Sequence, residues 1–445
     1  MPDSADDIQR PPPPHLLVFP FPAQGHLIPI VNLSENLVSR FGFSITVVVT
    51  PKNLPLILPH VTCSPQIHPL VLSLPSSSVL SSEAEHVRDL PHGVHSVALI
   101  RALSSLLPLV HEWACSQPQL PSAILSDFFL GFCLDLALDL RIPHLAFFSS
   151  GALLASLLHQ LFLLPSHTTS LPIHPHLRFS SLPSFLFSHL LPSSAATHAA
   201  ILNTFDFLES PYLAHLRATA YASGRIWAVG PIFPSVASTD ENEKILRWLD
   251  ICPKRSVVYV CFGSQFTLEP AVTTALAAAL EGSGARFLWA VGQGGAYVPE
   301  GFEARVGARG MVWRGWAPQV AVLRHKSVGA FLTHCGWNSV LEGLTAGVVL
   351  LAWPMEADQF VNAQLLVEEA GVAVSAWAGG SGTVPEVGEL ARVIAESVEE
   401  ENWPELRARA AEMGKRAKQA VTEGGSSFVE LEQMVKLLTR TAVGE

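Results

Sequence analysis

The 445-residue sequence has few charged side chains, and it is poorest in positive ones. Asp, Glu, Lys and Arg make up 15% of the chain, below the usual level of roughly 25% in globular domains. With 27 Lys and Arg against 38 Asp and Glu, the net charge is −11. This argues against a nucleic-acid-binding protein, because a phosphate backbone attracts the opposite sign. The negative net charge does not exclude binding of small anionic ligands, since helix N-termini bind phosphate without a basic surface.

The sequence also lacks the cysteine, glycine and leader patterns of several protein classes. None of its six cysteines forms a CxxC pair, which argues against a zinc ribbon or a dense disulfide framework and favours free thiols in a reducing cytosol. No GxGxxG follows the first apolar run, which argues against a dinucleotide-dependent oxidoreductase. The N-terminus is acidic and shows no signal-peptide pattern. We therefore expect a cytoplasmic protein.

One stretch tests the expectation that the chain stays out of the membrane. Residues 142–164 are almost uncharged and are long enough to cross a bilayer. The stretch contains Pro143, and Gly151 follows directly after two serines. This interruption predicts a strand, a turn and a buried helix, so we expect no stable membrane insertion.

Short apolar runs alternate with helical patterns, which is typical of parallel sheets covered by helices on both faces. In the first half, strand-like runs lie at 16–19, 44–50, 123–126 and 144–148, with a helical pattern at 28–40. A segment rich in Pro, Ser, Thr and acidic residues, 230–243, predicts an interdomain linker. After it, strands are expected at 256–262, 285–291, 310–316, 328–333 and 348–353, and helices at 269–281, 317–324, 338–345, 357–370 and, broken at Gly424 and Gly425, 403–441.

This alternation predicts an α/β chain of two Rossmann-like domains that face a cleft. We place the first domain at 1–233, the linker at 234–250 and the second domain at 251–425. The last helix, 426–445, is expected to pack back on the first domain. Residues 164–194, rich in Pro, Ser, Leu and His, are expected to form an irregular wall over an apolar cavity.

Polar and aromatic residues are densest between Trp316 and Gln359, at predicted turns between strands and helices. Ligands of an open parallel sheet bind at the carboxyl ends of its strands. Residues 334–339 lie at such an end and open a helix, whose free N–H groups suit a diphosphate. Glu342, one turn further on, is placed to accept a hydrogen bond from a ribose hydroxyl, and Trp316 offers a flat face to a base.

Residues 316–359 resemble, in length and order, the box that marks plant family-1 UDP-sugar-dependent glycosyltransferases, which have the GT-B fold. Phe21-Pro-Ala-Gln-Gly-His26 and Val260-Cys-Phe-Gly-Ser264 resemble the same family. The resemblance covers nearly the whole chain. Its detailed pattern is similar to a subgroup of flavonol and small-phenolic glycosyltransferases.

The resemblance implies where a UDP-sugar donor binds. Trp316 would stack on uracil, Gln319 would bind the uridine and Glu342 would take the ribose hydroxyls. The turn that includes Gly336 would hold the diphosphate, with help from Ser264. The side chains expected on the diphosphate are those of His334, Asn338 and Ser339.

The same resemblance implies contacts to the sugar. Trp337, Asp358 and Gln359 would contact its hydroxyls, since a carboxylate beside an amide suits a vicinal diol. Ser149 matches a position that touches the 6-hydroxyl. Gln359 as the last residue of the box is associated with glucose donors.

The resemblance makes His26 the general base that takes the proton of the acceptor hydroxyl, with Asp127 as the carboxylate behind it. Histidine suits this task near neutral pH, and a carboxylate fixes its tautomer. The implied reaction is a direct displacement that inverts an α-linked donor into a β-glucoside, without a metal or another cofactor. The pairs His92/His95 and His174/His176 have no carboxylate or cysteine set nearby, so we expect no metal site there.

Three departures from the family pattern keep alternatives open. Val349 stands where the family usually has Pro, and Glu356 holds a usually uncharged position near the sugar. Residues 164–204 are shorter than the counterpart that builds part of the acceptor pocket.

We expect a monomer that moves glucose from UDP-glucose to a flavonoid or another small phenolic. The alternatives are a UDP-rhamnose-dependent flavonol rhamnosyltransferase, a catalytically silent UDP-sugar-binding protein, and a nucleotide-sugar hydrolase or epimerase.

Overall fold

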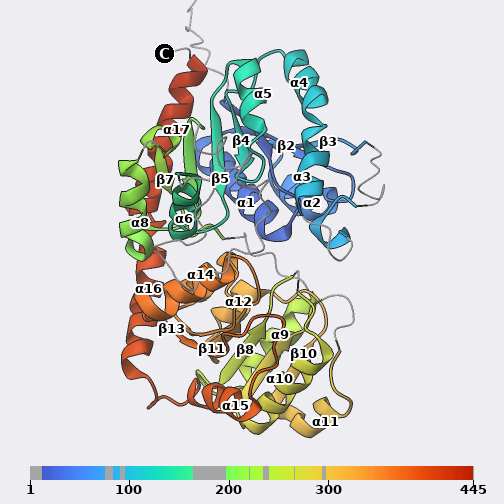
Figure 1. Ribbon diagram of the computed structural model, residues 1–445, viewed down its shortest axis with the longest axis vertical. Coiled ribbons are helices and arrows are strands. Elements are labelled where there is room, and N and C mark those ends of the chain that lie inside the picture. The colour runs from blue at the N-terminus through green and yellow to red at the C-terminus, as the bar shows by residue number, and fades with distance from the viewer. Residues whose placement is uncertain are drawn as a thin grey trace, which may run out of the picture.

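The computed structural model describes residues 13–75, 84–90, 96–163, 197–219, 221–233, 240–264, 266–292 and 297–443. They form two α/β domains stacked along the long axis of the molecule (Figure 1), each built on a parallel sheet flanked by helices. The expected class, an α/β chain of two Rossmann-like domains, is confirmed.

The first sheet has seven strands in the order β3-β2-β1-β4-β5-β6-β7. Its central strands are continuous apolar runs buried on both faces, as parallel strands between two helix layers must be. The strands are β1 His15–Phe19, β2 Ser44–Val49, β3 Ile67–Val71, β4 Ala123–Asp127, β5 His144–Phe148, β6 Ala199–Leu202 and β7 Ile226–Ala228. The helices are α1 Gln24–Phe41, α2 Leu54–Cys63, α3 Ser96–Ser104, α4 Leu107–Ser116, α5 Cys133–Leu140, α6 Ala152–Leu163 and α8 Asp206–Ala218.

The second sheet has six strands in the order β10-β9-β8-β11-β12-β13. The strands are β8 Val257–Cys261, β9 Arg286–Ala290, β10 Gly310–Trp313, β11 Val328–Thr333, β12 Val349–Ala352 and β13 Ala373–Ser375. The helices are α9 Asp240–Asp250, α10 Pro270–Gly282, α11 Phe302–Val306, α12 Gln319–Leu323, α13 Trp337–Ala346, α14 Gln359–Gln364, which continues as a π-helical turn Leu365–Glu369, α15 Val387–Glu396, α16 Pro404–Ala420 and α17 Ser426–Val443.

The strand order reverses once in each sheet, and both reversals lie at the centre. In the first sheet β1 pairs with β4, where Phe19 lies opposite Ser126. In the second sheet β8 pairs with β11, where Cys261 lies opposite Thr333. The loops that leave the carboxyl ends of such a pair diverge and leave a crevice, which is where open α/β sheets bind ligands.

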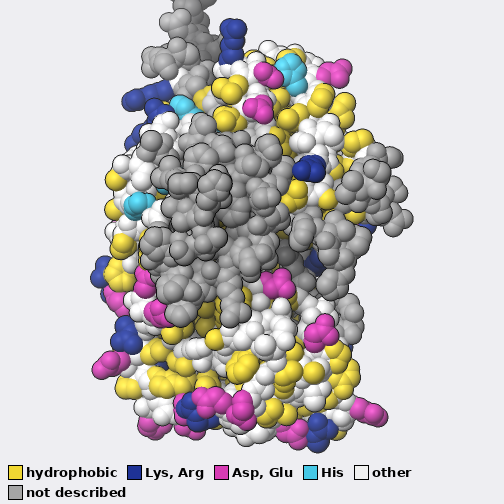
Figure 2. All heavy atoms as spheres, viewed as in Figure 1, with side chains coloured by type: hydrophobic (Ala, Val, Ile, Leu, Met, Phe, Trp, Pro, Cys, Tyr) yellow, Lys and Arg dark blue, Asp and Glu magenta, His cyan; other side chains and the backbone are white. Residues whose placement is uncertain are grey.

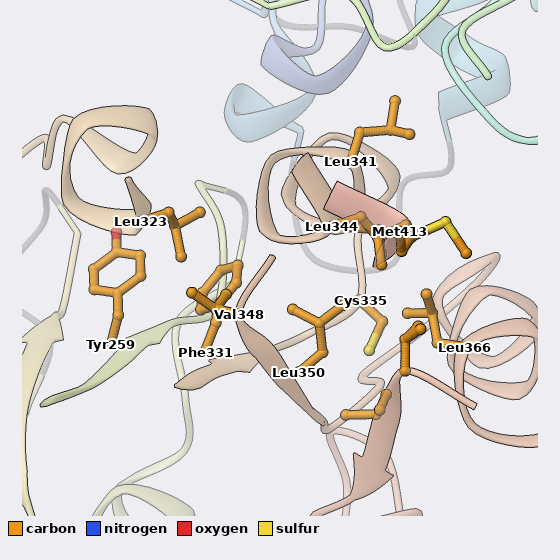
Figure 3. Packing of buried hydrophobic residues seen from close by; sticks show 14 of the residues in the cluster. Tyr259, Leu323, Phe331, Cys335, Leu341, Leu344, Val348, Leu350, Leu366 and Met413 are labelled. Atoms are coloured by element: carbon orange, nitrogen blue, oxygen red, sulfur yellow. The ribbon is translucent and has the colours of Figure 1, made fainter. Parts of the chain in front are cut away.

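A buried apolar cluster fixes α13 on the second sheet. Figure 3 shows Phe331 and Leu350, from neighbouring strands, beneath Leu341 and Leu344 of α13, with Met413 of α16 at the side. Each of these side chains is at most 5% exposed. Because this contact holds the helix along its length, the first turn of α13 stays at the carboxyl edge of the sheet.

The C-terminal helices tie the two domains together. α16 packs against α13 and against α8 of the first domain, and α17 packs against β7. Leu431, Met434 and Leu438 of α17 belong to the apolar core of the first sheet. The carboxylate of Glu430 accepts hydrogen bonds from Arg217 and from the backbone N–H of Ala228. The last described helix therefore packs on the first domain.

Charges of both signs are intermixed at the far end of the second domain. Figure 2 shows Lys and Arg side chains next to Asp and Glu at the lower end of the molecule. Arg392 of α15 contacts Glu389 and Glu396, and Arg305 of α11 contacts Glu281. Because water and salt screen exposed pairs of this kind, they contribute little to stability.

The stretch 142–164 folds as the sequence predicts. Strand β5 ends at Phe148, a turn follows at 149–150, and α6 begins at Ala152 with its first residues buried. Among the described residues, a single helical stretch, 96–116, has the length and apolar character to cross a membrane. A single stretch of this kind is weak evidence, and this one is interrupted at 105–106 between α3 and α4.

Part of the segment assigned to the linker is a helix. α9 covers Asp240–Asp250, and its side chains Ile245 and Leu249 are fully buried in the core of the second domain. The expected helix 357–370 is also modified, because α14 ends at Gln364 and a π-helical turn follows. The expected cavity wall 164–194 and the histidine pairs at 92/95 and 174/176 lie outside the described residues.

Candidate active site

A cavity of about 1870 Å³ lies between the carboxyl ends of the two sheets. Residues of both domains line it. Every site residue expected from the sequence is among them except Asp127, which lies behind His26. The lining members of that set are His26, Ser149, Ser264, Trp316, Gln319, His334, Gly336, Trp337, Asn338, Ser339, Glu342, Asp358 and Gln359.

His26 and Asp127 form a hydrogen-bonded pair across the central strands of the first sheet. His26 lies in the first turn of α1, and Asp127 is the last residue of β4. The distance from His26 Nδ1 to Asp127 Oδ2 is 2.8 Å, and the other carboxylate oxygen accepts from Phe129 N at 2.9 Å. When Nδ1–H donates to the carboxylate, Nε2 is left free to accept a proton.

The surroundings of His26 tune its pKa. Burial lowers the pKa of His26, but the charge and hydrogen bond of Asp127, together with the charge of Asp358, raise it by more, so the net value lies above the ordinary 6.5. The ring is stacked on Phe129 at a centroid distance of 5.0 Å. The hydroxyl of Ser149 lies 3.0 Å from Nδ1, a contact that the sequence analysis did not anticipate.

His334, after β11, is enclosed by two glycines. A Cβ on Gly263 would lie 2.6 Å from His334 Nε2, and one on Gly336 would lie 2.5 Å from it. Only glycine therefore leaves room for the imidazole on both sides. Burial lowers the pKa of His334 to about 4, so the ring is neutral at pH 7. Its Nδ1 has no hydrogen-bond partner among the described residues.

The side chain of Gln319 orients two neighbours. Its Nε2 donates to Ser339 Oγ at 2.9 Å and to Glu342 Oε2 at 2.7 Å, and its Oε1 accepts from Tyr259 at 3.2 Å. Burial raises the pKa of Glu342 to about 7, although the Gln319 hydrogen bond lowers it. Trp316 stands at the same end of the cavity with 56% of its surface exposed, so a face of the indole is available for stacking.

Asp358 and Gln359 open α14 on the sugar side of the expected site. Gln359 Oε1 accepts from the backbone N–H of Met355 at 2.9 Å and of Glu356 at 3.1 Å. Its NH₂ group is therefore the part left for a ligand. Asp358 accepts from Asn362 at 2.9 Å, and burial raises the pKa of Asp358.

Trp337 and Asn338, at the start of α13, both reach the first domain. Trp337 Nε1 donates to the backbone carbonyl of Asn203 at 2.6 Å, and Asn338 Nδ2 donates to the carbonyl of Gly25 at 2.9 Å. Trp337 is only 4% exposed. The sequence analysis placed Trp337 at the sugar hydroxyls, and the structure engages its indole N–H in the contact between the domains.

Arg88 makes a third contact across the cleft. Its guanidinium donates to Gln24 at 2.7 Å and to the backbone carbonyl of Ser264 at 2.5 Å. Ser264 itself lines the cavity beside Gly263. The sequence analysis missed Arg88 and Asn203, because each is a single residue without a motif around it.

The chain is similar to known proteins over nearly its whole length. Residues 237–403 match the family model described as UDP-glucoronosyl and UDP-glucosyl transferase. UDP-glycosyltransferase 89A2 of Arabidopsis thaliana is 41% identical over 451 residues, which cover 95% of this chain and 96% of that protein. Flavonol 3-O-glucosyltransferase UGT89B1 of the same plant is 40% identical, with 97% of each chain covered.

The chain belongs to the plant UDP-glycosyltransferase family. The solved structure of Arabidopsis thaliana UGT89C1 with UDP-L-rhamnose superposes on it with a TM-score of 0.84 at 35% identity, covering 96% of this chain and 100% of that one. This UDP-glycosyltransferase therefore has the GT-B fold implied by the resemblance of its 316–359 box. The described residues contain no group of three or more His, Cys, Asp or Glu placed to hold a metal ion.

Proposed function

We propose that this UDP-glycosyltransferase moves glucose from UDP-glucose to a hydroxyl of a flavonoid or another small phenolic, with inversion at the anomeric carbon. One observation carries the proposal. His26, backed by Asp127, and the first turn of α13 line the same cavity from opposite domains, so a base and a diphosphate site would face each other across one substrate.

In the proposed reaction Nε2 of His26 takes the proton of the acceptor hydroxyl. The acceptor oxygen attacks the anomeric carbon, and the bond between that carbon and the UDP oxygen breaks. The electron pair leaves with UDP, so the leaving diphosphate gains negative charge. The positive end of the α13 dipole and hydrogen bonds from His334 and Ser339 stabilise this charge. The proposal needs no metal and no cofactor besides the donor.

Aromatic side chains around His26 support a flat acceptor. Phe21 lies edge-on to the His26 ring at 5.4 Å, and Phe128 and Phe129 flank it at 5.9 and 5.0 Å. All three phenylalanines line the cavity. Apolar, largely aromatic walls with a few polar groups favour a planar phenolic over a charged or strongly polar acceptor. The likeness to a flavonol 3-O-glucosyltransferase supports the same class.

UDP-rhamnose is the second candidate donor. The likeness to UGT89C1, whose structure was solved with UDP-L-rhamnose, favours it. Gln359 favours glucose, because the resemblance associates Gln at this position with glucose donors. Its carbonyl is fixed by the backbone N–H groups of Met355 and Glu356, which leaves its NH₂ for a sugar hydroxyl. Glu356 accepts a hydrogen bond from Ser381 at 3.2 Å, which holds this unusual carboxylate at the edge of the sugar site.

A donor-by-acceptor matrix on the purified protein tests the proposal. UDP-glucose, UDP-rhamnose and UDP-galactose are each paired with flavonols, simple phenolic acids and a terpenoid alcohol, and products are identified by mass and NMR. A phenolic β-glucoside is expected. A rhamnoside as product would show that UDP-rhamnose is the donor, and it would leave the role of His26 unchanged. Tight binding of UDP without any product would favour a catalytically silent UDP-sugar-binding protein.

A further inference from the structure

The first turn of α1 contains a carbonyl that its own helix cannot satisfy in the usual way. In an α-helix the carbonyl of residue i accepts a hydrogen bond from the N–H of residue i+4. The fourth residue after Gly25 is Pro29, which lies inside α1 and has no N–H. The carbonyl of Gly25, directly before His26, is therefore open to a donor from outside the helix.

The donor comes from the other domain. Asn338 Nδ2 lies 2.9 Å from Gly25 O, and a Cβ added to Gly25 would lie 3.8 Å from the same nitrogen. Asn338 is the second residue of α13. The bond thus joins the first turns of the two helices that follow the central strands β1 and β11. An Asn amide has two N–H groups, so one remains for a ligand in the cavity.

We propose that Pro29 is a positioning residue, which withholds an N–H from the Gly25 carbonyl and so reserves that carbonyl for Asn338. The same amide then connects the diphosphate site to the turn that carries His26. This inference rests on the proposed function, in which the second N–H of Asn338 holds the donor diphosphate. Bound donor fixes the amide, and the amide fixes the turn of the base.

The connection matters because the base acts only within hydrogen-bond reach of the acceptor hydroxyl. A small shift of the first turn of α1 moves Nε2 of His26 relative to a donor held on the other domain, and such misplacement lowers the rate of transfer. Proline inside a helix is also unfavourable for stability. Replacing it is therefore expected to keep or raise the stability of the fold, so a loss of function is not explained by unfolding.

Pro29→Ala supplies an N–H that competes with Asn338 for the Gly25 carbonyl. We expect the Kd for UDP, measured by titration calorimetry, to rise about three- to tenfold, and kcat at saturating donor to fall by a similar factor. The midpoint of thermal unfolding is expected to stay unchanged or to rise. Pro211→Ala is the matched control, because Pro211 also lies inside a helix, α8, but does not line the cavity.

An ester at position 29 separates the missing N–H from the shape of the proline ring. L-lactic acid in place of Pro29 has the methyl group of alanine but an oxygen where alanine has its N–H. We expect it to keep the wild-type Kd and kcat within about twofold. Equal losses in the lactic acid and alanine variants, or no loss in Pro29→Ala, would overturn the proposal.

The two readouts separate this inference from the proposed function. UDP binding is measured without acceptor and without transfer. If the wild-type protein transferred no sugar, the proposed function would fail, and the comparison of UDP affinities between Pro29→Ala, Pro211→Ala and wild type would still decide the role of Pro29.

Discussion

The two halves of the proposed active site are assembled in opposite ways. The donor half comes almost entirely from one stretch, 316–359, whose consecutive loops all reach the cavity. The base half is collected from distant points of the first domain: His26 follows β1, Asp127 ends β4 and Ser149 follows β5. A contiguous half is visible in the sequence as a motif. A dispersed half becomes visible only through the order of the strands.

The halves also treat histidine differently. His26 lies against a buried carboxylate, which holds its pKa above the ordinary value. His334 has no such partner, and burial alone lowers its pKa to about 4. The first ring is suited to take up a proton, whereas the second stays neutral as a hydrogen-bonding group. The difference shows how surroundings, and not residue type, separate the roles of two histidines in one cavity.

Removal of the base should have the largest effect on the transfer rate and should leave the donor half unchanged. His26→Ala is expected to lower the transfer rate by about 10³-fold, because a positioned general base contributes a factor of that size. The Kd for UDP should stay within about twofold, since the donor half is intact. His60→Ala is a matched control, because His60 also lines the cavity and is paired with a carboxylate, Glu35, at 2.8 Å. A comparable loss in the control would remove His26 as the base.

The carboxylate behind the base should give the next largest effect. For the wild type, kcat/KM should rise with pH through a value above 6.5, because the base must be neutral and Asp127 favours its protonated form. Asp127→Asn removes the charge and leaves the lowering effect of burial. We expect a loss of about 10²-fold and a shift of the acidic limb to lower pH. A pH–rate profile with an unmoved limb would contradict the assignment.

Glu342→Gln probes the donor half alone. The fold raises the pKa of Glu342 from its ordinary value of 4.5 to about 7. The ionised carboxylate therefore destabilises the folded state increasingly as the pH rises from 4.5 to 7, and by the full amount above pH 7. The neutral variant should therefore be more stable at pH 8, by up to about 3 kcal/mol, and unchanged near pH 4. The Kd for UDP should rise about tenfold. Denaturant unfolding at both pH values and titration with UDP measure the two effects, and equal stability at pH 8 would contradict the account.

The contact between the halves should give the smallest catalytic effect. Trp337→Phe leaves the Asn203 carbonyl without its donor, which costs about 1–3 kcal/mol of stability, while the Kd for UDP changes less than about threefold. Trp353→Phe is the control, because Trp353 is fully buried and its Nε1 has no partner among the described residues. If both variants lose the same stability in denaturant unfolding, the interdomain hydrogen bond contributes nothing.

The sequence was most informative where apolar runs are long. The strands expected at 256–262 and 328–333 form as β8 and β11 with nearly the same bounds. β6, β7 and β13, which have only three or four residues each, were missed, as was β3, in which His68 and Pro69 interrupt the apolar run. The linker was extended too far, to residue 250, because the polar residues of α9 resemble a linker. The buried side chains of Ile245 and Leu249 show that α9 belongs to the second domain.

The site was predictable to the extent that it is local. The place of the 316–359 residues at the cavity and the pairing of His26 with Asp127 were predicted, because motifs carry them, while the roles of these residues stay predictions. The contacts of Trp337 with Asn203 and of Ser149 with His26 were not. Both contacts join elements that are far apart in the chain, and no local sequence pattern predicts which distant elements come together.

A crystal structure with an unreactive fluorinated UDP-glucose and a flavonol tests the central claim most directly. The claim is that one substrate pair spans a dispersed base and a contiguous donor site. We predict the diphosphate at the first turn of α13 and one acceptor hydroxyl within about 3 Å of Nε2 of His26. A diphosphate bound elsewhere, or an acceptor whose hydroxyls all lie out of reach of His26, would contradict it.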